Sequence, residues 1–419
     1  MHKEGKVVEY YGSLISVEKI DGKSEIALNI FPKKFLEIYT ETDFWNNGLG
    51  EDVPSSYVEI IIDDRLRVDS ELINLPSKFK KYQWFEIELT EDEGIPVQFY
   101  KSIVSIQNIR RRLKRIQFID GRTIFARKIK KAFFINKRES TISEIQKVLE
   151  DLEISFLAVY DVGQGSCNAF CDSDGMPQLY FDLGGGYKRN ATTYPTSLSL
   201  CSHSKPPVIL SHWDGDHWKS ARKFQQFAKY IWIVPRQIVT HDALKLAIEI
   251  NRQGTLLIWP KAIQDCDVSF GKIIKCSGDI KDINNSGLAT IFIQEDENEE
   301  DKLYKTLLPG DANYNNIPLI NSFKFNNLIV THHGGINPGN VPSPKNVDNN
   351  CHVYSYGQGN SHEHPFKTTI SEHDNAGWIN KLETINKHIA IGRNLQLNQI
   401  NKHHKSTTCF CNTVIVQKN

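Results

Sequence analysis

The sequence has no excess of either charge and no long apolar run. Its 50 lysines and arginines equal its 50 aspartates and glutamates, so no overall field draws the protein to nucleic acid or to a membrane. No apolar run reaches the roughly 18 residues of a membrane-spanning helix. The opening MHKEGKVVEYYGS lacks the apolar core of a signal peptide. These absences predict a soluble, cytoplasmic protein without a membrane partner.

The sequence also lacks paired cysteine motifs. None of its eight cysteines forms a CxxC pair, which excludes the common zinc-finger spacings. In a reducing compartment such residues are expected to be buried thiols. The alternative is a thiolate metal ligand near the C-terminus, for which the candidates are Cys409 and Cys411.

The 419 residues suggest two or three domains. Residues 1–138 are rich in Val, Ile, Tyr and Phe between Gly, Asp and Pro, which predicts a small β-rich domain, a barrel or a sandwich, that binds substrate or a partner. Residues 139–152 predict a connecting helix, because Thr141 and Glu144 have capping-box spacing. Residues 153–419 predict the catalytic domain, in which apolar strands lead into Gly, Asp or His.

The stretch VILSHWDGDHWKS (208–220) places two imidazoles and two carboxylates directly after an apolar strand. His212, Asp214, Asp216 and His217 are ligand types for a divalent metal, and a tight turn after a strand can direct them to one point. The alternative is helix capping, but Asp216 alone would suffice for that. The crowding therefore favours a metal site.

Later apolar strands are also followed by aspartate or histidine residues that could bind a metal. LLPGDA supplies Asp311, LIVTHHGG supplies His332 and His333, and GQGNSHEHP supplies His364. HWDGDH followed by GDA and HHGG resembles the metallo-β-lactamase fold. YDVGQGSCNAF and YFDLGGG are similar to one branch of it, the metal-dependent domain of the DNA-uptake channel proteins of competent bacteria. The resemblance covers about residues 153 to 370, and it implies an α+β fold, an αββα sandwich preceded by the small β-rich domain.

The resemblance also implies a site for two divalent ions, zinc or manganese, with magnesium as a further option. It assigns His212 and Asp214 to the first ion, Asp216, His217 and His333 to the second, and Asp311 to both. Such ions activate water and stabilise an in-line displacement at phosphorus. Asp216 and His364 are the candidate catalytic groups, although His364 is also a candidate ligand or ligand-orienting group. The residues expected to orient the ligands are Asp161, Asp182 and His332, with turn chemistry as the alternative for both aspartates.

Two departures affect the first metal position. The family usually has a histidine where this chain has Asp214, and a further histidine before the bridging aspartate. Residues 218–310 offer only His241, for which a surface or capping role is the alternative. A histidine-poor position favours manganese or magnesium over zinc. His332 and His333 compete for one ligand position, and the resemblance favours His333.

The resemblance favours a phosphodiesterase or nuclease acting on nucleic acid or a nucleotide. A basic run also points to phosphate, and its residues are Arg110, Arg111, Arg112, Lys114 and Arg115. The equal alternative for this run, and for RKIKK at 127–131, is a solvated face of an edge strand. Two further hypotheses remain open: hydrolysis of a lactone or thioester, and a non-catalytic module with a degenerate metal site.

Overall fold

The computed structural model divides the chain into two compact units. One comprises Met1–Asn136 and Ile238–Ile248, and the other comprises Lys137–Gln237 and Glu249–Asn419. The residues that it describes are 7–20, 23–39, 45, 55–63, 72–76, 78–79, 83–101, 107, 109–280, 282–295, 303–346 and 350–392.

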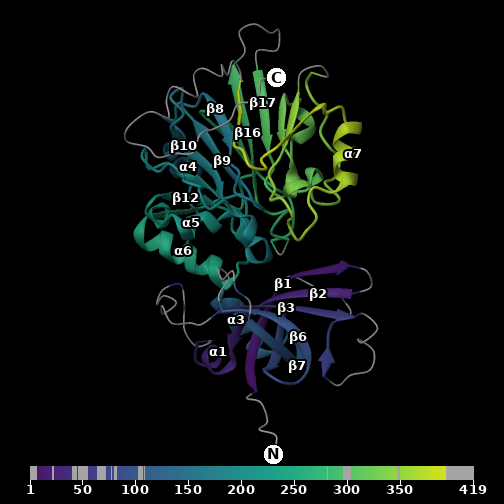
Figure 1. The fold of residues 1–419 in the computed structure, drawn as a ribbon. Helices are drawn as coiled ribbons and strands as arrows, with labels where there is room; N and C mark the ends of the chain where they lie inside the picture. Colours follow the sequence, from purple (N-terminus) through teal and green to yellow (C-terminus); the bar gives the residue numbers. More distant parts are fainter. Residues whose placement is uncertain are drawn as a thin grey trace, which may run out of the picture. The chain divides into compact units, whose positions relative to one another are not determined.

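The first unit is a closed barrel of six strands (Figure 1). Its strands pair in the order β7-β5-β1-β2-β3-β6, and β6 pairs with β7 to close the ring. The short strand β4 (Ile73–Asn74) adds to the outer edge of β7. The barrel strands are β1 (Val8–Ile20), β2 (Lys23–Pro32), β3 (Ser56–Asp63), β5 (Trp84–Thr90), β6 (Ile95–Tyr100) and β7 (Ile109–Ile119).

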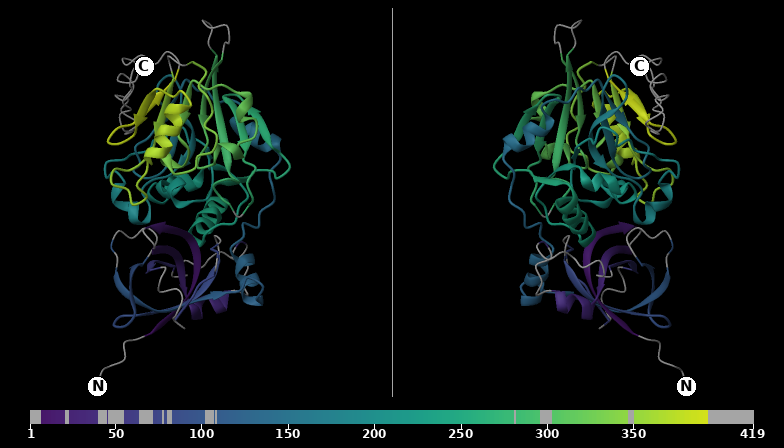
Figure 2. Two further views of the ribbon diagram at one scale, coloured as in Figure 1. Left: turned by 90° about the vertical axis from the view of Figure 1, so that its right-hand side faces the viewer. Right: turned by 90° about the vertical axis from the view of Figure 1, so that its left-hand side faces the viewer.

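Alternating apolar residues fill the barrel. Ile26, Leu28 and Ile30 of β2 are fully buried and pack with Val58 and Ile60 of β3 in one core. This period of two places every second side chain inside, as a half-buried strand requires. Figure 2 shows the barrel strands, in purple and blue, from two further sides. Two helices belong to the same unit, α1 (Lys33–Tyr39) and α3 (Ile124–Ala132).

The second unit contains two seven-stranded sheets. The first has the order β13-β12-β11-β10-β9-β8-β21, with bounds β8 (Phe156–Val159), β9 (Cys167–Cys171), β10 (Pro177–Leu183), β11 (Val208–Ile209), β12 (Ile231–Val234), β13 (Thr255–Ile258) and β21 (Ile389–Ile391). The second has the order β14-β15-β16-β17-β18-β19-β20, with bounds β14 (Asp265–Val268), β15 (Gly271–Lys275), β16 (Leu288–Glu295), β17 (Leu303–Leu308), β18 (Asn327–Ile329), β19 (Cys351–Tyr354) and β20 (Asn380–Glu383).

One apolar core joins these two sheets. Phe170 and Phe181 of the first sheet and Ile273 and Leu288 of the second belong to the same cluster of buried side chains. Strands β10, β11 and β12 are parallel to one another, as are β17, β18 and β19. Because the carboxyl ends of parallel neighbours meet at one edge, loops that leave these strands lie close together.

The predicted αββα sandwich is wrong. Among the described residues, 36% lie in strands against 21% in helices, and these residues form a closed six-stranded barrel and several sheets. One reason is local. The helical pattern SARKFQQFAKY breaks at Phe224, whose backbone (φ −107°, ψ 73°) is not helical. It therefore forms the short helix α5 (Lys219–Lys223) and a turn of 3-10 helix, Gln225–Lys229.

Three other helices belong to the described part of the chain. Helix α4 (Ile142–Leu149) begins with the expected capping box, since Thr141 and Glu144 exchange side-chain and backbone hydrogen bonds. Helix α6 spans His241–Gln253 and α7 spans Lys367–Asn375. Among the residues described here, no helix is both long and apolar enough to span a membrane.

Candidate metal centre

Strand ends of both sheets supply the side chains of the candidate centre. Ser211 and His212 follow β11 of the first sheet, and Asp311 follows β17 of the second. His333 lies in the 3-10 turn Thr331–Gly334 after β18. His212 and Asp311 are about a hundred positions apart in the chain and follow strands of different sheets, so the packing of the two sheets on one core brings them together, whereas the parallel pairing of β17 with β18 places His333 beside Asp311.

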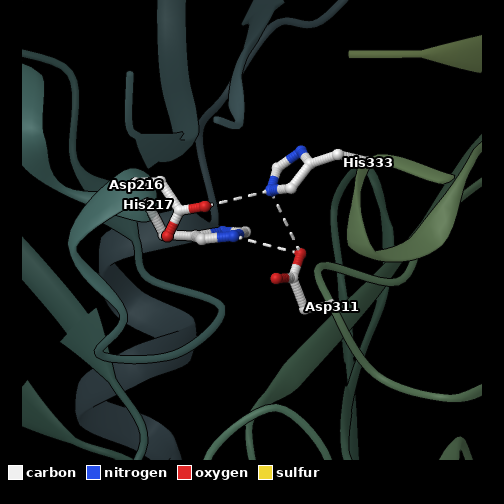
Figure 3. Close-up of side chains that lie close together, drawn as sticks. All are labelled: Asp216, His217, Asp311 and His333. Carbon is white, nitrogen blue, oxygen red and sulfur yellow. Dashed lines mark ion pairs between the residues drawn. The ribbon is translucent and has the colours of Figure 1, made fainter. Parts of the chain in front are cut away.

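Four side chains form a group that could hold a metal ion: Asp216, His217, Asp311 and His333. One ligand atom from each lies within 4.8 Å of the others. His217 Nε2 is 3.0 Å from Asp311 Oδ1, and His333 Nε2 is 3.6 Å from the same oxygen. His333 Nε2 is also 3.3 Å from Asp216 Oδ2 (Figure 3). Two imidazoles and two carboxylates thus point at one small volume.

The facing atoms are buried and have no hydrogen-bond partner within the described part of the protein. This holds for Nε2 of His212, His217 and His333 and for Oδ1 of Asp311. An unsatisfied buried polar atom is costly, and in native proteins it commonly marks a bound ion or water. Buried, unsatisfied atoms that gather around Asp311 in this way fit bound cations.

The opposite nitrogen of each imidazole is held by another group. His217 Nδ1 lies 2.7 Å from Asp182 Oδ2, and His333 Nδ1 donates to the Ser355 carbonyl at 2.9 Å. His212 Nδ1 lies 3.0 Å from Ser211 Oγ. Since a carbonyl only accepts, His333 carries a proton on Nδ1 and can present the lone pair of Nε2 to a metal.

The charges in this group stabilise one another. Burial raises the pKa of Asp216, but the neighbouring imidazoles of His333 and His217 outweigh it and lower that pKa to about 2. Burial likewise opposes ionisation of Asp311, yet nearby imidazoles hold its pKa well below the usual range. Burial lowers the pKa of His217, but Asp311 and Asp182 raise it well above its ordinary value. Both carboxylates therefore stay ionised at neutral pH.

His212, Asp214 and His332 lie on the other side of Asp311. His212 Nε2 is 3.7 Å from Asp311 Oδ2 and 3.6 Å from Asp214 Oδ2. His332 Nε2 is 3.8 Å from Asp311 Oδ2. The structure thus brings together the six residues that the resemblance assigned as metal ligands, together with His332.

Glycine permits the close packing behind Asp216. A Cβ added to Gly184 would lie 1.7 Å from the Asp216 carbonyl oxygen, and one added to Gly165 would lie 2.6 Å from it. The same carbonyl accepts hydrogen bonds from the backbone of Ser166 and Gly185. The glycines of DVGQG and LGGG therefore let the loops after β8 and β10 hold the turn that carries Asp216 and His217.

His364 lies beside the two histidines of HHGG. Its ring centroid is 5.4 Å from that of His332 and 6.4 Å from that of His333. Burial, followed by the charges of neighbouring imidazoles, lowers the pKa of His364 to about 2, so it is neutral. Gln164 Nε2 lies 3.1 Å from His364 Nδ1, and Asn360 accepts from the backbone of His364. A Gln164 amide that donates to Nδ1 leaves the imidazole proton on Nε2.

Asp182 and Asp161 differ in their surroundings. Asp182 accepts from the backbone and hydroxyl of Ser211 and contacts His217. Asp161 instead accepts from the backbone of Gly163, at the turn after β8, and no ligand contact is recorded for it in the described structure. The alternative of turn chemistry, which the sequence analysis left open, describes Asp161.

Other candidates lie elsewhere. The His241 ring packs on Phe31 and Phe133 in the barrel unit, with ring centroids 5.0 and 5.9 Å away.

The basic residues Arg110 to Arg115 lie on β7, which pairs on both sides and is not an edge strand. RKIKK falls in α3, not in a strand. Cys409 and Cys411 lie outside the described residues, and the other six cysteines are buried free thiols.

Sequence reasoning missed a buried network behind the histidine turn. The backbone of Thr331 donates to Tyr314 Oη, and that hydroxyl lies 3.0 Å from His373 Nε2 of α7. Thr369, one turn earlier on α7, donates from its hydroxyl to the Gly335 carbonyl. Helix α7 thus fixes both ends of the turn that carries His332 and His333. No sequence motif marks these residues, because their contacts join positions far apart in the chain and each residue by itself looks like an ordinary core side chain.

Comparisons of the chain with protein-family models, with curated proteins and with solved structures found no match.

Proposed function

We propose that this protein is a metal-dependent hydrolase that cleaves phosphodiester bonds with two divalent cations. One observation carries the proposal: unpartnered Nε2 atoms of buried histidines converge with two ionised carboxylates on one point. The order of the motifs HWDGDH, GDA and HHGG also supports it, since they resemble those of metal-dependent hydrolases.

The donor set suits zinc or manganese. Asp216, His217, Asp311 Oδ1 and His333 would hold one cation, with two nitrogens and two oxygens as ligands. His212 and Asp214 would contribute to the other, and Asp311 Oδ2 would reach it from the opposite side. Imidazole and carboxylate together accept zinc or manganese, whereas magnesium prefers oxygen alone. Bound cations would lower the pKa of water toward neutrality and stabilise charge on phosphate oxygens.

The protein's own groups position the reaction. Asp182, Ser211 and the Ser355 carbonyl hold the imidazoles so that each Nε2 points inward. Such outer hydrogen bonds fix both the ring orientation and the tautomer. Asp216 remains ionised, and because its side chain is 25% exposed it can accept a hydrogen bond from a water molecule at the site and orient it.

His364 has the position and protonation state of a hydrogen-bond donor. Its neutral ring keeps the proton on Nε2 while Gln164 occupies Nδ1. A neutral imidazole is a weak acid, so we assign it to hold a phosphate oxygen by hydrogen bonding. Replacement by Gln should therefore slow hydrolysis without removing cation binding.

Nucleic acid or a nucleotide is the proposed substrate class, with the β-rich barrel presenting substrate or a protein partner. The observation that favours phosphate is a cluster of exposed cations on β7, where Arg110 and Lys114 are exposed. Not all of the run is available, since Arg111 lies 3.0 Å from Glu91 and Arg115 lies 3.4 Å from Glu88.

The test measures hydrolysis and metal content together. The full chain is freed of metal with a chelator, loaded with Mn²⁺ or Zn²⁺, and assayed on an aryl phosphodiester and on single- and double-stranded DNA and RNA. We expect cleavage that requires the cation and is lost in Asp311→Ala together with the bound metal. His203→Asn, at an exposed turn, is the matched control and should retain both.

Two outcomes would contradict the proposal. Cleavage of a lactone or thioester with no phosphodiester cleavage would assign the other hydrolase class. A folded protein that binds no cation and cleaves none of these substrates would assign a non-catalytic module.

A further inference from the structure

The two oxygens of Asp311 face two different pairs of imidazoles. Oδ1 faces His217 at 3.0 Å and His333 at 3.6 Å. Oδ2 faces His212 at 3.7 Å and His332 at 3.8 Å. In every case the facing atom of the imidazole is Nε2. A carboxylate with imidazoles on both oxygens has the arrangement of a ligand shared by two cations.

His332 reaches Asp311 Oδ2 because the turn that carries it has an unusual backbone. His332 (φ 49°, ψ 38°) and His333 (φ 56°, ψ 19°) are consecutive residues in the left-handed region. Residues with a Cβ rarely adopt this conformation, and two in succession are rarer still. This turn sends consecutive side chains to opposite oxygens of Asp311. An extended backbone would point them to opposite faces of the strand instead.

We infer that His332 is the fourth protein side chain of the first cation position, beside His212, Asp214 and shared Asp311. This inference rests on the proposed function, because it concerns the same centre. The independent observation is His212, whose side chain is 1% exposed and whose Nε2 points toward Asp214 and Asp311 without a hydrogen-bond partner in the described structure. A cation held by Asp214 and Asp311 would satisfy that nitrogen.

His332 also fills the position that the sequence left without a histidine. Between residues 218 and 310 the only histidine is His241, and its ring packs among Phe31 and Phe133 of the other unit. His332 instead comes from the turn that already supplies His333. With it, the first position has two imidazole nitrogens and two carboxylate oxygens, the same donor types as the second.

The two positions differ in exposure. The His332 side chain is 44% exposed, whereas those of His217 and His333 are 0% and 3% exposed. A ligand that water can reach holds its cation less firmly than a buried one. The His332 position is therefore the weaker of the two, and the one with room for a substrate oxygen.

The experiment titrates metal-free protein with Mn²⁺ and measures bound metal by equilibrium dialysis and elemental analysis. We expect wild type to bind two cations of unequal affinity. His332→Asn keeps a residue that tolerates left-handed backbone but is too short to reach Asp311 Oδ2. It should lose the weaker cation, with a Kd raised by at least roughly tenfold, and should keep the tighter one.

Two further variants complete the design. His203→Asn removes an exposed imidazole away from the centre and should bind two cations as wild type does. His333→Asn should weaken the tighter cation instead of the weaker one. Melting temperatures of the metal-free proteins identify any variant that fails to fold, and such a variant would be replaced by His332→Gln.

The outcomes separate this inference from the proposed function. If wild type binds two cations, His332→Asn binds one, and no phosphodiester is cleaved, the inference is supported and the function is wrong. A wild type that binds a single Mn²⁺, or a folded His332→Asn that binds two with unchanged affinity, would overturn the inference even if phosphodiesters are cleaved.

Discussion

Asp182 Oδ2 lies 2.7 Å from His217 Nδ1, and both side chains are fully buried. The same carboxylate accepts from the backbone and hydroxyl of Ser211, the residue before His212. One carboxylate thus supports the strand end from which the motif HWDGDH begins. It stabilises the tautomer in which His217 Nε2 is the metal-facing atom.

Asp182→Asn should weaken cation binding without unfolding the protein. Its amide can donate to His217 Nδ1, which favours the tautomer with the proton on Nε2, facing the metal. We expect the Kd of the tighter cation to rise by roughly 10–100-fold. Isothermal titration with Zn²⁺ or Mn²⁺ measures this change.

The matched control for this prediction is Asp172→Asn. Asp172 accepts backbone hydrogen bonds in the hairpin turn between β9 and β10 and has no contact with the ligands in the described structure. Its replacement should leave cation affinity unchanged. An equal loss of affinity in both variants would mean that Asp182 acts through general stability and not through His217.

The convergence of these segments on the candidate centre could be anticipated because each segment follows an apolar strand. VIL before His212, TLLPG before Asp311 and LIV before His332 are strand ends, where functional side chains concentrate. The direction in which each side chain points could not be predicted. That His332 and His333 face opposite oxygens depends on two left-handed residues, which no residue pattern specifies.

The fold was predicted less well. Alternation in residues 1–135 indicated strands but left a barrel and a sandwich open, and the pairing of β6 with β7 decides for the barrel. One of the two interpretations placed RKIKK on an edge strand, but the segment forms part of α3, whose Ile129 is buried. Partners such as Gln164 and His364 lie 200 positions apart, and a single sequence carries no signal for such contacts.

His352 should make the free energy of unfolding depend on pH. Burial, followed by the charges of His373 and Lys381, lowers the pKa of His352 to about 3. In the unfolded chain the pKa is about 6.5, so between these values only the unfolded state binds this proton. The stabilising contribution of neutral His352 to the free energy of unfolding is therefore fully present above pH 6.5. It decreases as the pH falls toward 3, by about 1.4 kcal/mol per pH unit.

Urea unfolding at several pH values, followed by circular dichroism, checks this prediction. His352→Phe removes the titrating group while keeping a ring beside Tyr354 and Trp378. The loss of stability between pH 6.5 and 5 should be about 2 kcal/mol smaller in this variant than in wild type. Parallel pH profiles for the two proteins would show that His352 is charged in the folded state.

If the barrel binds nucleic acid through β7, its arginines should contribute unequally. Each phosphate contact that is lost reduces the slope of log K against log salt by about 0.9 for duplex DNA. Arg110 and Lys114 are exposed, and in the described structure no carboxylate pairs with them. Arg111 and Arg115 already face Glu91 and Glu88.

The variants Arg110→Ala and Lys114→Ala should therefore each lower the slope by nearly one. The variants Arg111→Ala and Arg115→Ala should lower it less, because an arginine paired with a carboxylate releases fewer counterions. Fluorescence anisotropy with a labelled duplex at several salt concentrations measures these slopes. If binding to the wild-type protein does not depend on salt, the basic residues of β7 do not contact the phosphates.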